Sequence, residues 1–228
     1  MSETAPPALG EIVAANPAVA RTLDRLGLDY CCHGRRTLAE ACAAAGLDPA
    51  VVAAELEALP TAGDRTWTGL EPPALVDHIV TTHHRYLETE LPLLEALAAK
   101  VFSVHGDRHP ELSEVTALVE AIRAELEPHL RQEEELLFPA VHAWSAGGGD
   151  FSFGFLPDLV RAMEGEHDQA GDILAALRRA TAAYRVPADA CASYRSLFER
   201  LEALELDTHL HVHKENHALF PAVLKMTV

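Results

Sequence analysis

The stretch "HLRQEEELLFP" at residues 129–139 has a second copy in "HVHKENHALFP" at residues 211–221. Both copies share the pattern H-x3-E-x3-L-F-P. A helix brings residues i and i+4 onto one face, so the histidine and the glutamate of each copy project in the same direction. A carboxylate in a helical core is costly without a positive partner. The repeat therefore predicts two helices that each turn a His–Glu pair toward a shared cation. The Leu and Phe that follow are expected to close the core, and the proline to perturb the helix.

Four long amphipathic segments follow one another in the chain, at about residues 73–100, 110–143, 154–182 and 188–225. Each carries apolar residues at i, i+3 and i+4 spacing, and histidine interrupts the apolar stripe at mid-length. In the first segment the spacing admits either His83 or His84, and in the third it selects His167. Strand signals are nearly absent, and connections that are polar or contain Gly or Pro separate the segments. The pattern predicts an all-α protein whose main part is an antiparallel four-helix bundle.

A smaller helical module is predicted ahead of the bundle, over residues 1–60. Asp48 and Pro49 form a good N-cap and first-turn pair for its last helix. The stretch rich in Pro, Gly and Thr that follows is interpreted as a linker over residues 61–72. The bundle is then expected over residues 73–228.

Composition narrows the class of protein. The chain has 228 residues, 49% of them hydrophobic, which is enough for a real core. Its formal net charge of -17 argues against binding nucleic acid through phosphates. No run approaches the ~18 apolar residues that a membrane helix needs, and the start "MSETAPPALGEIV" lacks the features of a signal peptide. We expect a cytoplasmic protein that binds neither nucleic acid nor membrane.

The inward groups of the four segments form a candidate metal site. They are one histidine from the first segment together with His129, Glu133, His167, His211 and Glu215. Four imidazoles and two carboxylates are too many ligands for one tetrahedral zinc ion and suit two transition-metal ions bridged by the carboxylates. A ligand set of nitrogen and oxygen atoms without thiolate favours iron as the bound metal, and manganese or zinc are the next candidates. An isolated H-x3-E is usually a solvated surface pair, but two pairs within apolar stripes, with matching histidines in both other segments, argue against that alternative.

The chain has 13 histidines, more than this site needs. Those that lie off the stripes or near segment ends are interpreted as exposed or as neighbours of the ligands: His78, His105, His109, His142, His209, His213 and His217. His83 is an alternative to His84 as the metal ligand of the first segment, because helical periodicity does not distinguish between the two.

Two adjacent cysteines, Cys31 and Cys32, lie in the N-terminal module. A disulfide between neighbours is strained, so both are expected to be free thiols. They could supply reducing equivalents, hold iron or a cluster transiently, or pair with another chain. The alternative is a buried or inert turn. Cys42 and Cys191 lie in Ala-rich surroundings and are interpreted as packing residues.

Together with the repeat, the stretches "DYCCHGRRTL", "VFSVHGD" and "MEGEHDQAG" resemble the RIC family of iron–sulfur cluster repair proteins, also called YtfE or ScdA proteins. The resemblance covers nearly the whole chain. It implies a ScdA-like module with its Cys-Cys pair, followed by a hemerythrin-like four-helix bundle that holds a non-haem di-iron centre. His33 stands where relatives commonly have glycine.

The resemblance also implies residue roles. The family's first ligand lies seven residues before a Leu-Pro, and Leu91-Pro92 therefore selects His84 over His83. Glu125 and Glu166 match glutamates thought to line a path to the metals. The implied metal ligands are His84, His129, Glu133, His167, His211 and Glu215.

The implied function is repair of iron–sulfur clusters damaged by nitrosative or oxidative stress, by iron delivery or by nitric oxide chemistry. If both glutamates and an oxo or hydroxo group bridge the irons, each octahedral iron keeps one open position for nitric oxide, oxygen or peroxide. The expected partners are damaged iron–sulfur proteins, and the sequence leaves a homodimer open. Two alternatives use the same residues, namely a sensor or carrier of oxygen or nitric oxide, and a nitric oxide reductase.

Overall fold

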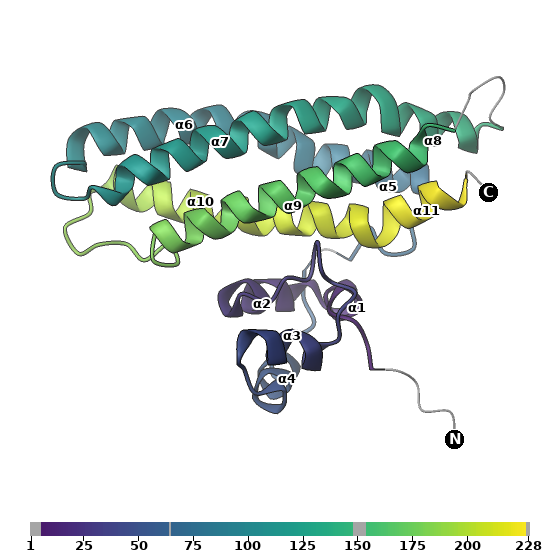
Figure 1. The fold of residues 1–228 in the computed structure, drawn as a ribbon, viewed down its shortest axis with the longest axis horizontal. Coiled ribbons are helices and arrows are strands. Elements are labelled where there is room, and N and C mark those ends of the chain that lie inside the picture. Colours follow the sequence, from purple (N-terminus) through teal and green to yellow (C-terminus); the bar gives the residue numbers. More distant parts are fainter. Residues whose placement is uncertain (1–5, 64, 148–153, 227–228) are drawn as a thin grey trace.

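The computed structural model describes residues 6–63, 65–147 and 154–226, and its larger part is a bundle of four long helical columns (Figure 1). Three columns contain a π-helical turn. In chain order the four columns are α5 (Pro72–Ile79), the π-turn η2 (Val80–His84) and α6 (Arg85–His105); α7 (Glu111–Gln132), the π-turn η3 (Glu133–Leu137) and α8 (Phe138–Ser145); α9 (Leu156–Ala180); and α10 (Ala192–Lys214), the π-turn η4 (Glu215–Leu219) and α11 (Phe220–Lys225). Helix α7 packs against α6 and α9, and α10 packs against the same two. The expected all-α antiparallel bundle is confirmed.

Two of the column ends differ from expectation. The first column runs on to His105, five residues past the expected end at 100. The fourth begins at Ala192 rather than at 188, because Cys191 is its extended N-cap residue and Pro187 lies in the connection before it. Among the described helices, none combines the length and the hydrophobicity that crossing a bilayer requires.

The π-turns explain the Leu-Phe-Pro ending of the repeat. Pro139 and Pro221 have no N–H to give to the carbonyl one helical turn earlier, so the α-helical ladder cannot continue unchanged. In each copy the Phe before the proline instead donates its N–H to the carbonyl of the glutamate five residues back, Phe138 to Glu133 and Phe220 to Glu215. Both Phe side chains are buried. The expectation that this ending closes the core and perturbs the helix is confirmed.

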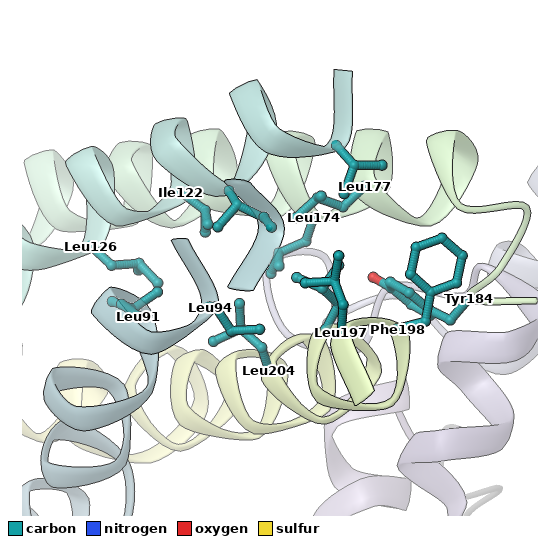
Figure 2. Close-up of a cluster of buried hydrophobic side chains, with 14 of the residues drawn as sticks. Leu91, Leu94, Ile122, Leu126, Leu174, Leu177, Tyr184, Leu197, Phe198 and Leu204 are labelled. Carbon is teal, nitrogen blue, oxygen red and sulfur yellow. The ribbon is translucent and has the colours of Figure 1, made fainter. Parts of the chain in front are cut away.

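One apolar cluster fills the half of the bundle away from the histidine layer (Figure 2). Leu91 and Leu94 from α6 meet Ile122 and Leu126 from α7, and α9 and α10 contribute further leucines. This cluster aligns the four columns and so fixes the spacing at which their polar side chains face one another.

Adjacent leucines on α6 provide a matched test of this core. Leu94 is fully buried, whereas Leu93 is 51% exposed. We expect Leu94→Ala to lower the free energy of unfolding by about 2–5 kcal/mol, because it removes buried methyl groups and leaves a cavity. Leu93→Ala should change it by less than about 0.5 kcal/mol. Urea unfolding of both variants, at fixed metal loading, measures the difference, and equal losses would contradict this packing.

The N-terminal module contains α1 (Leu9–Ala15), the 3-10 turn η1 (Pro17–Val19), α2 (Ala20–Leu26), α3 (Leu38–Ala45) and α4 (Pro49–Glu57). As expected, Asp48 caps α4, because its side chain accepts the N–H of Ala50 at 2.8 Å. The module lies along the fourth column (Figure 1), and Val212 of α10 belongs to its apolar cluster. The turn with Cys31 and Cys32 contacts the bundle next to Glu215, because Asn216 donates to the carbonyl of Cys31 at 3.3 Å.

Candidate metal centre

Six buried side chains from all four columns converge in one layer of the bundle. They form two groups of four, whose ligand atoms lie within 4.8 Å of one another inside each group. His84 and His211 complete one group and His129 and His167 the other. Glu133 and Glu215 belong to both groups.

The Nε2 atoms of the imidazoles point at the two carboxylates. His84 and His129 place Nε2 at 3.4 Å and 3.5 Å from Glu133 Oε2. On the other side, the Nε2 atoms of His167 and His211 lie 3.2 Å from Oε2 and 3.0 Å from Oε1 of Glu215. This arrangement places two carboxylates between two pairs of imidazoles, which is the donor set of a carboxylate-bridged pair of metal ions.

Several donor atoms in this layer have no hydrogen-bond partner among the described residues. They include Nε2 of His84, both oxygens of Glu133 and Oε2 of Glu215, all of them buried. A buried polar atom without a partner costs about 1–3 kcal/mol, and a buried charge costs more. Cations at the centre of the six side chains would satisfy these atoms, so the residues present fit a metal pair.

The charges in this layer also favour a cation. Burial lowers the pKa of His84, but Glu133, together with Glu215 and Glu134, raises it, and the net shift is upward. His129 and His167 are likewise raised in pKa, against burial, by Glu133 and by Glu215 respectively. Burial together with the charge of Glu215 raises the pKa of Glu133. Without a cation, Glu133 and Glu215 repel each other when both are ionised, and metal ions between them would allow both to carry a negative charge.

Three of the four imidazoles are held by an acceptor on their second nitrogen. The Nδ1 atom of His84 lies 2.9 Å from Glu134 Oε1, and that of His129 lies 2.7 Å from Glu166 Oε2. His167 Nδ1 lies 3.0 Å from Asn216 Oδ1. Such acceptors fix the ring orientation and make Nε2 a better donor to a metal.

His211 is the exception. Its Nδ1 has no hydrogen-bond partner in the described part of the chain, and burial lowers its pKa to about 3. The ring of His83 stacks on the ring of His211 at 5.3 Å, with 10° between the planes. His211 is therefore kept neutral and in place by packing, without an acceptor.

His83 itself is buried but lies outside both four-donor groups. Its Nδ1 meets Asp207 Oδ1 at 2.9 Å, and its Nε2 meets Lys214 Nζ at 2.7 Å. Of the two histidines, His84 is the one whose side chain belongs to a four-donor group. Both side chains can be buried because the π-turn η2 ends at His84 and widens the helix there.

The two glutamates expected on a path to the metals differ in their contacts. Glu166 is partly exposed and bonded to His129, as described above. Glu125 lies one turn before His129 on α7, half-buried, and makes no hydrogen bond or ion pair with any described residue. Cys31 and Cys32 are free thiols and lie outside the two groups.

Two predictions from the sequence are wrong, one about the exposure of two histidines and one about the role of a cysteine. His105 and His213 are buried, not exposed, and no hydrogen bond or ring contact among the described residues joins either of them to one of the six donors. His105 Nε2 lies 3.2 Å from Cys191 Sγ, and His213 packs its ring against Tyr30 and Trp67. Cys191 is exposed at a helix start and is no packing residue, whereas Cys42 is buried as expected.

Sequence reasoning missed the acceptors, although the repeat contains a signal for two of them. Glu134 and Asn216 each follow the bridging glutamate of their own copy, and each holds the single histidine of the neighbouring column. The position after the glutamate is therefore part of the site. A polar residue there in both copies is the signal that could have found it.

Comparisons with known proteins agree with this geometry. Residues 75–223 match the family model described as the hemerythrin HHE cation binding domain, and residues 7–60 match ScdA_N, described as a domain of unknown function (DUF542). A probable iron–sulfur cluster repair protein of Haemophilus influenzae is 34% identical over 95% of this chain and 96% of its own. The iron–sulfur cluster repair protein ScdA of Staphylococcus haemolyticus is 33% identical over 93% and 95%. The iron–sulfur cluster repair protein YtfE of Escherichia coli is 31% identical over 95% and 96%. The chain therefore belongs to the YtfE/ScdA family of iron–sulfur cluster repair proteins, which join a ScdA_N domain to a hemerythrin HHE cation binding domain.

Proposed function

We propose that this protein is a non-haem di-iron protein that repairs iron–sulfur clusters damaged by nitrosative or oxidative stress. The observation that carries the proposal is the pair of four-donor groups that share Glu133 and Glu215. Relatives that align over nearly the whole chain are iron–sulfur cluster repair proteins by name, and this supports the same role for this protein. The proposed compartment is the cytoplasm, where Cys31 and Cys32 stay reduced.

In this proposal His84 and His211 would hold one iron ion and His129 and His167 the other, and Glu133 and Glu215 would be shared by both ions. Iron bound there, with an oxo or hydroxo group as a further ligand, would supply binding of nitric oxide, oxygen or peroxide and a store of iron for a damaged cluster. The acceptors Glu134, Glu166 and Asn216 keep three of the imidazoles oriented.

Two aromatic rings shield the layer on its outer side. Phe220 stacks on His167 at 5.5 Å with 3° between the planes, and Phe138 lies 5.3 Å from the ring of His84. All six donor side chains are at most 3% exposed. The chain therefore keeps bulk water away from the donors, which suits chemistry with a small uncharged reactant such as nitric oxide.

The test is reactivation of an iron–sulfur enzyme that nitric oxide has inactivated, with iron-loaded protein and without oxygen. We expect wild-type protein to restore activity and His129→Ala to lose nearly all of this effect, because the variant lacks a donor of one iron. His109→Ala is the matched control, since His109 pairs with Asp189 at 3.1 Å far from the donor layer. It should repair as well as the wild type.

The same assay distinguishes the alternatives. Iron-loaded protein that binds nitric oxide reversibly but restores no activity would replace the repair proposal with a sensor or carrier. Repeated nitrous oxide formation from nitric oxide and a reductant, again without reactivation, would replace it with a nitric oxide reductase. Retention of full repair by His129→Ala would show that the donor layer is not where repair occurs.

A further inference from the structure

A second group of metal-binding side chains lies outside the bundle, in the turn between α2 and α3. It consists of Asp29, Cys31 and Cys32, whose ligand atoms lie within 4.8 Å of one another. The two sulfur atoms are 3.8 Å apart, and both thiols are free. Two thiolates bound to one tetrahedral ion at about 2.3 Å also lie about 3.8 Å apart. The thiols thus already have the spacing that one shared ion requires.

Asp29 organises this turn. Its Oδ1 accepts the N–H groups of Cys31 and Cys32 at 3.0 Å and 2.9 Å, and the thiol of Cys31 at 3.3 Å. Its Oδ2 meets His33 Nδ1 at 2.6 Å. A carboxylate has about four acceptor positions, so Oδ1 can bind an ion that replaces the thiol proton. His33 would then stay in place and orient the carboxylate.

An acidic cavity of about 440 Å³ lies beside the thiols, between the module and helices α9 and α10. The basic groups in its wall are paired: Arg178 with Glu205 at 2.9 Å, and His209 with Asp24 at 2.8 Å. Two further carboxylates of α9 line it without an ion pair to any described residue, Asp168 and Asp172. A cavity with this excess of negative charge attracts cations and repels anionic ligands.

The thiol turn is connected to the metal layer of the bundle. Asn216 donates its Nδ2–H to the carbonyl of Cys31 at 3.3 Å, while its Oδ1 accepts from His167 at 3.0 Å. A Cβ atom at Gly171, one turn after His167, would lie 4.0 Å from Cys32 Sγ. An ion held by the thiols would therefore lie beside α9, close to the layer that contains His167.

The electrostatic surroundings argue against the other roles considered for the thiols. The hydrogen bond with Cys32 and burial raise the pKa of Cys31 well above its ordinary value, and the charge of Asp29 adds to the shift. A thiol that stays protonated at neutral pH is a poor nucleophile for disulfide exchange. A metal ion reverses this, because a coordinating thiol loses its proton.

We propose that Asp29, Cys31 and Cys32 form a second cation site, which takes one thiophilic divalent ion such as ferrous iron or zinc and leaves its remaining position open to the acidic cavity. Binding forms two metal–sulfur bonds and one metal–oxygen bond, and the two thiol protons pass to solvent. The site is separate from the bundle centre, and its existence does not depend on the repair activity.

The test is a titration of the whole, metal-loaded protein with cadmium ions, after reduction with a phosphine under nitrogen and a count of free thiols. Charge-transfer absorption from thiolate to cadmium reports binding to sulfur, which the bundle donors lack. We expect the band to saturate at about one cadmium per chain. Excess zinc or ferrous ions should suppress the band, and excess magnesium should not, because magnesium prefers oxygen ligands.

Variants assign the signal to the turn. Cys31→Ser with Cys32→Ser should abolish the band while iron content and circular dichroism stay as in the wild type. Cys191→Ser, which removes an exposed thiol elsewhere, should leave the band unchanged. Asp29→Asn keeps the acceptor oxygen of the turn and should weaken cadmium binding roughly tenfold.

Four results would overturn the proposal. They are a band that survives the double serine substitution, an equal loss of the band in Cys191→Ser, suppression by magnesium, and the absence of any band when the thiol count shows Cys31 and Cys32 to be free. None of these results bears on reactivation of a nitrosylated enzyme, so the two proposals fail separately.

Discussion

A Glu133→Gln protein is expected to lose both metal ions rather than one, because Glu133 belongs to both four-donor groups. A glutamine has one oxygen acceptor and no charge, so it cannot bridge two cations as a carboxylate does. We expect metal affinity to fall by more than about 100-fold for both ions. Metal analysis after gel filtration measures the content per chain. Loss of a single ion would show that Glu133 serves only one of the two metals.

The same substitution is expected to act in the opposite direction on the metal-free protein. Glu133 is fully buried, and neither of its oxygens has a hydrogen-bond partner among the described residues. Without metal, the wild type must bury this carboxyl group beside Glu215, whereas glutamine carries no charge to desolvate. We expect metal-free Glu133→Gln to unfold at a higher temperature than metal-free wild type.

Metal should reverse that order. An ion at a free concentration of 100 times its dissociation constant stabilises the folded state by about 2.7 kcal/mol, and only the wild type can gain this. Thermal unfolding with and without a chelator should therefore rank metal-loaded wild type first, the variant second in either condition, and metal-free wild type last.

Glu134→Gln is the matched control, one residue away on the same π-turn. Glu134 is 30% exposed on its side chain and contacts His84 and Arg85. Its substitution should weaken only the ion held by His84 and His211, by roughly 10–100-fold. It should change the stability of the metal-free protein by less than about 1 kcal/mol. If Glu133→Gln and Glu134→Gln behaved alike, the shared carboxylate would be excluded.

The architecture could be predicted because it depends on local periodicity. Apolar residues at helical spacing identify four columns, and the H-x3-E pair places two donors on one face without any knowledge of the partner helices. His129 with Glu133, and His211 with Glu215, follow from this rule alone. The choice between His83 and His84 did not follow, because the π-turn η2 breaks the regular spacing at that point.

The acceptors could not be paired from one sequence because their contacts are distant along the chain. His83 meets Asp207 across 124 residues, and His84 meets Glu134 across 50. No local rule joins such positions. For Cys191 a local rule was available and misled. Its Ala-rich surroundings indicated a packing residue, but it lies exposed at a helix start.

An internal two-fold relation, visible in the repeat, connects these contacts. It exchanges the first two columns with the last two, so that His84 corresponds to His167 and His129 to His211. Glu134 and Asn216 are then equivalent acceptors, since Glu134 accepts from His84 and Asn216 accepts from His167. Phe138 and Phe220 lie against His84 and His167 at similar distances, 5.3 Å and 5.5 Å, although the first pair of rings is tilted by 34° and the second is stacked within 3°.

The relation fails at one position. Glu166, which precedes His167, accepts from His129. Its counterpart is His83, which precedes His84 and stacks on His211 without a hydrogen bond between them. The group of His129 and His167 thus has two held imidazoles, and the group of His84 and His211 has one. An imidazole N–H buried without an acceptor costs about 1–3 kcal/mol, and this cost falls on one group only.

We therefore expect the two metal ions to be held unequally, with the ion at His84 and His211 released first. A chelator should remove metal from the wild type in two phases, because the missing acceptor weakens binding by roughly 10–100-fold. Glu166→Ala removes the corresponding acceptor from His129, so both ions should then leave at similar, fast rates. Glu125→Ala, on the neighbouring helix α7, should keep both phases, since no side-chain hydrogen bond or ion pair among the described residues joins Glu125 to a donor. Release of both ions from the wild type in a single phase would show that stacking by His83 holds His211 as firmly as a carboxylate holds His129.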